Sequence, residues 1–139
     1  MRAICRSNCG SAIPVAERYW GETEKTDYSP LRVGGEYLIY ALLFVSERVD
    51  FLVGVPGQFP FWVPSSLFSL VDDEIPAGWK FCATQFHVDY KVLFEGFDVK
   101  CIVGYSLLVC EYRHYVGIVE RDPVELERFV LENYSEIVA

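Results

Sequence analysis

Two long apolar stretches separated by only three residues place the strongest constraint on the fold of this chain. The first, EYLIYALLFV (36–45), is apolar on both alternations, which is typical of a strand buried on both faces. The second, VDFLVGV (49–55), returns after the short turn SER (46–48), so the pair predicts a β-hairpin. Gly54 inside the second arm predicts a bend or bulge there.

Short strands and tight turns are predicted after this hairpin. PGQ (56–58) is a turn signal, and FPFWV (59–63) predicts a strand whose proline confines it to a sheet edge or a bulge. PSSLF (64–68) predicts a single 3₁₀ turn and SLV (69–71) a further short strand. This succession predicts the α+β class, as a small SH3-like β-barrel or curved antiparallel sheet with a C-terminal helix.

The length of 139 residues predicts one domain spanning 1–139. Its SH3-like part is expected at about 31–75, and added strands with the C-terminal helix at 79–139. MRAIC (1–5) predicts a first strand, and the glycines and prolines of 6–34 predict a long irregular loop. Six side chains are expected inside the barrel: Tyr37, Ile39, Leu43, Phe51, Val53 and Leu70.

The second half of the chain predicts more strands and then a helix. Strands are expected at 79–88, 90–94 and 99–110, whereas 112–121 is compatible with either a helix or a strand. The helix is expected over DPVELERFVLENYSEI (122–137), where Asp122 serves as N-cap and Pro123 occupies the first helical position.

The charge of the chain excludes two classes of partner. Twenty acidic and 12 basic residues give a net charge of −8, which repels nucleic-acid phosphates and anionic lipid headgroups. A basic protein is the expected partner. The chain opens without the apolar core of a signal peptide, and its longest apolar run, 37–45, is too short to cross a bilayer. These patterns predict a cytoplasmic protein without a membrane partner.

No catalytic or metal-binding motif stands out. Five cysteines are an odd number, and neither C-x-x-C nor H-x-x-x-H occurs, so we expect no metal and no cofactor. Cys82 with His87 is a conceivable nucleophile and base, but residues five apart on a strand point to opposite faces. Buried thiols at Cys82, Cys101 and Cys110, with partly exposed histidines, are the favoured interpretation, so no catalytic residue is predicted.

The segment FPFWVPSSLFSLVDDEIPAGW (59–79) carries the candidate site. Its five aromatic residues exceed what one short strand buries on one face, and three consecutive carboxylates follow them. Exposed rings beside carboxylates suit a protein interface, because rings give desolvated anchors and acids steer a cationic partner. The predicted partner-binding residues are Trp62, Asp72, Asp73, Glu74 and Trp79. Alternatively, the rings close the open end of the barrel and the acids solvate the next loop.

The runs VGGEYLIYALLF, DFLV and FWVPSSLFSLVDDEIPAGW together resemble a pattern found in small acidic uncharacterised bacterial proteins. The matching residues are Gly35, Glu36, Tyr37, Tyr40, Trp62, Pro64, Leu67, Phe68, Val71, Asp72 and Trp79. The stretch ERDPVELERF (120–129) is similar to the end of such proteins. Proteins of this type look like immunity proteins of bacterial toxin systems, so the resemblance implies a single domain that neutralises one cognate toxin.

Three functions therefore remain open from the sequence. The first is a non-enzymatic immunity protein that binds a basic toxin through its acidic, aromatic-bearing face. The second is a small enzyme with a carboxylate or a cysteine site in a cleft. The third is an SH3-like adaptor or ligand sensor, in which Tyr40 and Trp62 would bind a proline-rich segment.

Overall fold

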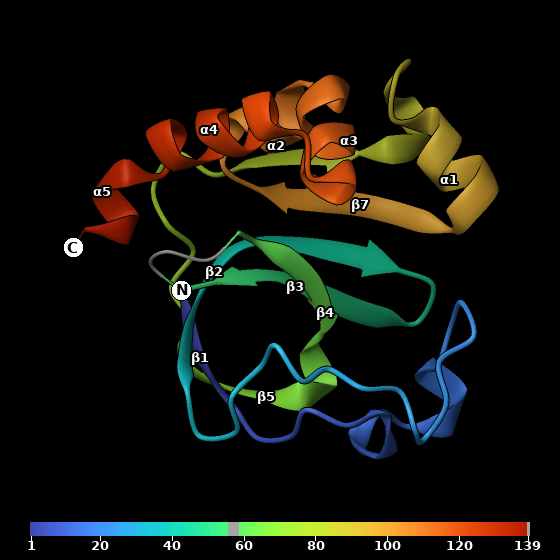
Figure 1. Ribbon diagram of the computed structural model, residues 1–139. Coiled ribbons are helices and arrows are strands. Elements are labelled where there is room, and N and C mark those ends of the chain that lie inside the picture. Colours follow the sequence, from blue (N-terminus) through green and yellow to red (C-terminus); the bar gives the residue numbers. More distant parts are fainter. Residues whose placement is uncertain (56–58, 139) are drawn as a thin grey trace.

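A computed structural model describes residues 1–55 and 59–138 of the chain, which form an antiparallel sheet and a group of short helices (Figure 1). The predicted turn at 56–58 lies outside the described residues. The seven strands are β1 (Arg2–Cys5), β2 (Glu36–Val45), β3 (Arg48–Gly54), β4 (Phe61–Pro64), β5 (Phe68–Asp72), β6 (Lys80–Ala83) and β7 (Val99–Gly104). Five of them follow the order β4-β3-β2-β1-β5, and β7 pairs with both β2 and β6. The class is therefore α+β, as predicted.

Strand β2 connects the two parts of the sheet, because one of its edges pairs with two different strands. The first residues of β2 pair with β1, and Ala41 to Val45 pair with β7. On its other edge β2 pairs with β3, where the register shifts between Ile39 and Ala41 and leaves Tyr40 as an extra residue. Such a bulge reverses the faces to which the following side chains point. One ten-residue strand thus contributes to two separate cores.

The first core lies inside the curved strands β1 to β5. Tyr37 and Ile39, which precede the bulge, belong to it, together with Phe51 and Val53 from β3. These four residues were predicted to lie there. Leu70 was predicted wrongly, since its side chain is 51% exposed. It lies on β5, which pairs with β1 at the end of the strand order, and the interior position is taken by Leu67 from the preceding 3₁₀ turn.

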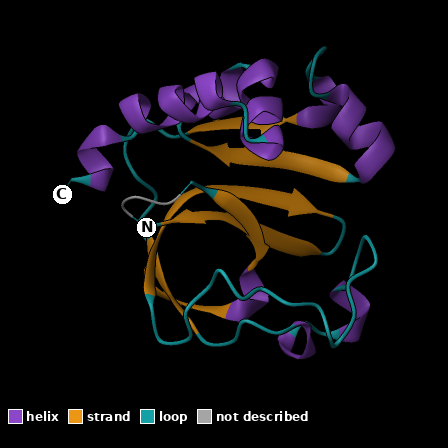
Figure 2. Cartoon of the chain, viewed as in Figure 1, coloured by secondary structure: helices purple, strands orange, loops and turns teal. Residues whose placement is uncertain are grey.

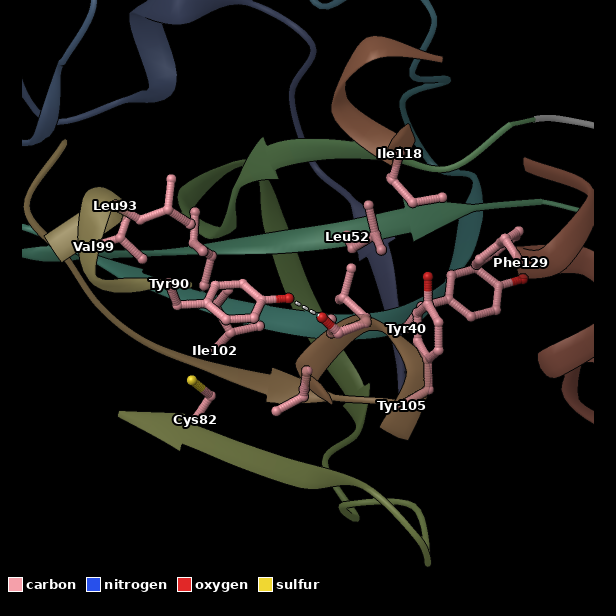
Figure 3. Packing of buried hydrophobic residues seen from close by; sticks show 14 of the residues in the cluster. Tyr40, Leu52, Cys82, Tyr90, Leu93, Val99, Ile102, Tyr105, Ile118 and Phe129 are labelled. Carbon is pink, nitrogen blue, oxygen red and sulfur yellow. Dashed lines mark hydrogen bonds between the residues drawn. The ribbon is translucent and has the colours of Figure 1, made fainter. Parts of the chain in front are cut away.

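The second core lies beside the helices and contains the residues of β2 that follow the bulge. Leu43, which was predicted inside the barrel, belongs to this core because the bulge has turned it to the opposite face. Figure 3 shows Tyr40, Tyr105 and Phe129 packed together at one end of this core and Tyr90 at the other. The Tyr90 hydroxyl donates a hydrogen bond to the Leu108 carbonyl, which keeps this buried polar group satisfied.

Five α-helices gather on the side of the molecule next to β7, opposite the curved strands (Figure 2). They are α1 (Lys91–Phe97), α2 (Ser106–Cys110), α3 (Tyr112–Glu120), α4 (Pro123–Glu132) and α5 (Tyr134–Ile137). The Asp122 side chain accepts a hydrogen bond from the backbone N–H of Val124 and so caps α4. Four 3₁₀ turns complete the described elements: η1 (Gly10–Ala12), η2 (Val15–Glu17), η3 (Ser65–Leu67) and η4 (Thr84–Phe86).

Three strand predictions in the second half of the chain need correction. Residues 91–94 lie in the helix α1, whose N-cap is Tyr90, and the side chains of Tyr90 and Leu93, three residues apart, are both buried. The strand predicted over 79–88 ends at Ala83, where η4 begins, and that over 99–110 ends at Gly104. Apolar runs of this length do not distinguish a strand from a short buried helix.

Candidate binding groove

A cavity of about 520 Å³ opens between the sheet, α1, α3 and the long loop that precedes β2. We call it the aromatic groove. Its lining residues are Trp20, Leu43, Asp50, Trp62, Leu93, Phe97, Val99, Tyr112, Tyr115, Val116, Val119 and Glu120. Asp50 and Glu120 are the charged members of this set. A mostly apolar cavity of this size with a few polar groups is typical of a binding site.

One wall of the groove is a row of three rings. The Trp62 ring lies 6.4 Å from that of Tyr115, centroid to centroid, and Tyr112 stacks on Tyr115 at 6.1 Å. Burial raises the pKa of Tyr115 to about 12, so its hydroxyl keeps its proton at neutral pH. The buried indole N–H of Trp62 finds no acceptor in the part of the chain that the structure describes. An unpaired buried donor of this kind is uncommon.

A buried guanidinium lies next to the groove. Arg48 Nε donates to Asp50 Oδ1 at 2.8 Å, and its Nη1 donates to the Glu17 carbonyl at 2.8 Å and to Glu22. The side chains of Arg48 and Asp50 are almost fully buried. Because Glu17 and Glu22 belong to the loop before β2, these bonds fasten that loop to the sheet.

The carboxylates around Arg48 respond differently to burial. Burial raises the pKa of Asp50, and Arg48 offsets only part of this effect. Burial also acts to raise the pKa of Glu22, but hydrogen bonds from Arg48, the Tyr19 backbone and Tyr28 outweigh it and leave that pKa lowered. The Arg48 pKa is raised because hydrogen bonding and charge attraction outweigh desolvation, so its positive charge is secure.

Trp20 stands at the mouth of the groove in an unusual backbone conformation. Its φ is +52° and that of Gly21 is +79°, and the Glu22 N–H donates to the Tyr19 carbonyl at 3.0 Å. This is the pattern of a type I′ turn, in which a bulky residue with positive φ is strained. The indole is 62% exposed, and the Arg48 guanidinium lies 5.7 Å from its ring centroid.

The residues predicted to bind a partner divide between two places. Trp62 lines the aromatic groove, whereas Trp79 lines a different, small cavity together with Met1. Asp72 lies near Met1, whose ammonium is 4.0 Å from its carboxylate. Asp73 and Glu74 are exposed in the loop after β5. The structure therefore does not assemble these five residues into one site.

Several groove residues were missed by sequence reasoning. Arg48 and Asp50 alternate on a strand that is otherwise apolar, which is a readable sign of a buried ion pair. Trp20 precedes a glycine within a long loop, which is a weaker sign. Tyr112, Tyr115 and Glu120 come together only because 112–120 is helical. Tyr40, expected beside Trp62 in an adaptor, is buried and does not line the groove.

A second cleft contains residues that the sequence analysis had considered for nucleophilic catalysis. Cys82, His87 and Cys110 line it together, because the turn η4 redirects the chain between Cys82 and His87. Burial raises the pKa of the Cys82 thiol, so the thiolate needed for attack is disfavoured at neutral pH. The Nδ1 atom of His87 accepts the backbone N–H groups of Asp89 and Tyr90. Cys110 is exposed and Cys101 half-buried, so the prediction of three buried thiols holds only for Cys82.

The other histidine is part of a buried polar chain. His114 was expected to be partly exposed but is completely buried. Its Nε2 lies 2.8 Å from the Tyr105 hydroxyl, and its Nδ1 lies 3.3 Å from Glu125 on α4. Arg128 donates to both Glu125 and Glu111. These bonds join Tyr105, which lies between β7 and α2, to α3 and α4, and they have a structural role.

The described residues contain no group of three or more histidine, cysteine, aspartate or glutamate side chains placed to hold a metal ion. Within the same residues, no helix combines the length and the apolar character that crossing a bilayer requires. Comparisons with protein-family models, curated proteins and solved structures find no match for this chain.

Proposed function

We propose that this chain is a non-enzymatic protein-binding module that engages a basic protein through the aromatic groove and its acidic surroundings. The observation that carries this proposal is the lining of the groove, in which rings surround two carboxylates and neither cysteine nor histidine occurs. Such a lining offers desolvated anchors for a partner, and Asp50, the carboxylate at its floor, is already engaged by Arg48.

The strand order of the curved part supports the finer proposal of an SH3-like barrel. The order β5-β1-β2-β3-β4, a long loop between β1 and β2, and a 3₁₀ turn between β4 and β5 are the features expected of such a barrel. In this proposal β6, β7 and the helices are additions, and they provide the α3 wall of the groove. The barrel serves as a rigid base that presents Trp62.

The more specific role that we propose is that of a cytoplasmic immunity protein, which neutralises a basic toxin. The net charge of −8 supports this role, since acidic inhibitors associate quickly with basic partners through long-range attraction. The same charge speaks against binding to nucleic acid or to an anionic membrane surface. Rings such as Trp20 and Trp62 would then slow dissociation once the complex has formed.

The proposal predicts that the gene immediately upstream encodes a toxin with a basic C-terminal domain, and co-expression of the chain with that domain tests it. We expect the chain to restore growth to a bacterial host that produces the toxin domain, and to co-purify with that domain as a stoichiometric complex. Trp20→Asn should weaken rescue, whereas Phe86→Asn, which changes an exposed ring outside the groove, should not. Failure to form a complex would contradict the proposed function. Loss of rescue by Phe86→Asn alone would move the docking face to the β6 side.

A further inference from the structure

We propose, on the basis of the proposed function, that the aromatic groove receives the side chain of an arginine or lysine residue of the partner. The methylene stem of that residue would lie along the row formed by Trp62, Tyr115 and Tyr112. Its cation would meet the carboxylate of Glu120, while Trp20 covers it from the loop. The groove is thus assigned to a residue type that a basic toxin presents in abundance.

The shape and lining of the groove suit a long side chain with an apolar stem. Apart from Asp50 and Glu120, its lining consists of aliphatic and aromatic residues, so a stem of three or four methylenes would be desolvated there. Rings facing such a stem also attract its cation through their π faces. A short polar side chain would leave most of this apolar surface in contact with water.

The charges of the groove favour a cation over an anion. Glu120 ends α3, is exposed, and makes no ion pair with any residue in the described part of the chain. Beside the groove, the guanidinium of Arg48 pairs with Asp50, which lines the groove, and with Glu22, so two carboxylates accompany one guanidinium there. An anionic guest would therefore meet unfavourable charge at both the rim and the floor.

The chain itself already binds one arginine in this way next to the groove. The guanidinium of Arg48 lies 5.1 Å from the ring centroid of Tyr19 and 5.7 Å from that of Trp20. It also donates to Asp50 at 2.8 Å. This combination of rings and a carboxylate around a guanidinium is the environment that the groove offers to a second cation through Trp62, Tyr115 and Glu120.

The three tryptophans make a direct test possible, because each gives one indole N–H signal in a ¹⁵N NMR spectrum. The purified chain is titrated with the probe Nα-acetyl-arginine methylamide. The signals of Trp20 and Trp62 should shift, and that of Trp79, which lines another cavity, should stay constant. The uncharged analogue Nα-acetyl-norleucine methylamide and the anionic Nα-acetyl-glutamate methylamide should bind at least about threefold more weakly.

Two charge variants complete the test. Glu120→Gln should weaken binding of the arginine probe about threefold or more, whereas Glu127→Gln, an exposed position on α4, should leave it unchanged. Equal binding of the norleucine and arginine probes, or no effect of Glu120→Gln, would overturn the inference. Because only the isolated chain is used, that result would leave the complex with the toxin domain standing. Intact arginine binding without such a complex would contradict the proposed function alone.

Discussion

Gly117 on α3 faces Glu125 on α4 so closely that a Cβ atom built on Gly117 would lie 2.3 Å from Cγ of Glu125. No real side chain tolerates such a contact, so the approach of the two helices depends on this glycine. Glu125 in turn contacts His114 and Arg128, which ties the polar chain to the same contact. A glycine that weakens the helix in isolation therefore allows α3 and α4 to pack.

Replacing Gly117 by alanine tests this packing. We expect Gly117→Ala to lower the free energy of unfolding by about 1–3 kcal/mol, because overpacking outweighs the better helix propensity of alanine. Urea denaturation followed by circular dichroism measures the change. Gly96→Ala on α1 is the matched control, since its Cβ would meet nothing within 4 Å, and it should be neutral or stabilising. Equal effects at the two positions would contradict the account.

Acid should destabilise the protein through His114. Desolvation lowers the pKa of this histidine, and its hydrogen bond to Glu125 only partly compensates. Below pH 6.5, His114 therefore binds a proton in the unfolded chain but not in the folded chain. The free energy of unfolding falls as the pH drops. The expected slope is up to about 1.4 kcal/mol per pH unit.

Denaturation series between about pH 5 and pH 7.5 would measure this dependence. Glu125 adds to the loss at lower pH. Burial acts to raise its pKa, but hydrogen bonds from Arg128 and His114 leave that pKa below the usual value. His114→Gln should flatten the profile between about pH 5 and 6.5 relative to the wild type. A wild-type profile that is flat in this range would refute the role of His114.

Removing the buried guanidinium should cost far more than removing an exposed one. Arg48→Ala leaves Asp50 buried without its partner, which typically costs about 3–5 kcal/mol. It also releases the loop before β2, so the amides of that loop should exchange hydrogen faster. Arg2→Ala breaks the exposed pair with Glu36, at 2.9 Å, and should cost about 1 kcal/mol or less. Similar losses of unfolding free energy for the two variants would contradict the structural role assigned to Arg48.

Trp20 should contribute to binding more than to stability. Trp20→Asn places a residue that tolerates positive φ in the turn, which offsets the loss of the contact with Arg48. The free energy of unfolding should therefore change by no more than about 1 kcal/mol. A loss of more than about 2 kcal/mol would identify Trp20 as a core residue and remove it from the binding face.

Some elements of this fold were predictable from the sequence and others were not. The β2–β3 hairpin and the capped α4 were predictable, because their signals lie in adjacent residues. The position of Leu43 was not, since the bulge at Tyr40 that redirects it depends on pairing with β3. The helix α1 was mistaken for a strand because the five-residue stretch 90–94 is too short to show a decisive period.

In the candidate site, too, some residues were predictable from the sequence and others were not. Trp62 was predicted as a binding residue from its place in an aromatic run, and it lines the groove. Its association with Trp79 came from closeness in sequence, and the two side chains lie in different cavities. Trp20, Tyr115 and Glu120 come from a loop and a helix far apart in the chain. Only the tertiary structure brings such residues together.

Stopped-flow association with the basic toxin domain that the proposal expects to be encoded upstream tests most directly whether this acidic, aromatic groove docks a basic protein. As salt rises from about 50 to 500 mM, the association rate constant should fall at least about tenfold, while the dissociation rate constant changes little. Trp20→Asn should act mainly by raising the dissociation rate constant. An association rate that is insensitive to salt, together with a Trp20→Asn variant that dissociates like the wild type, would contradict the account.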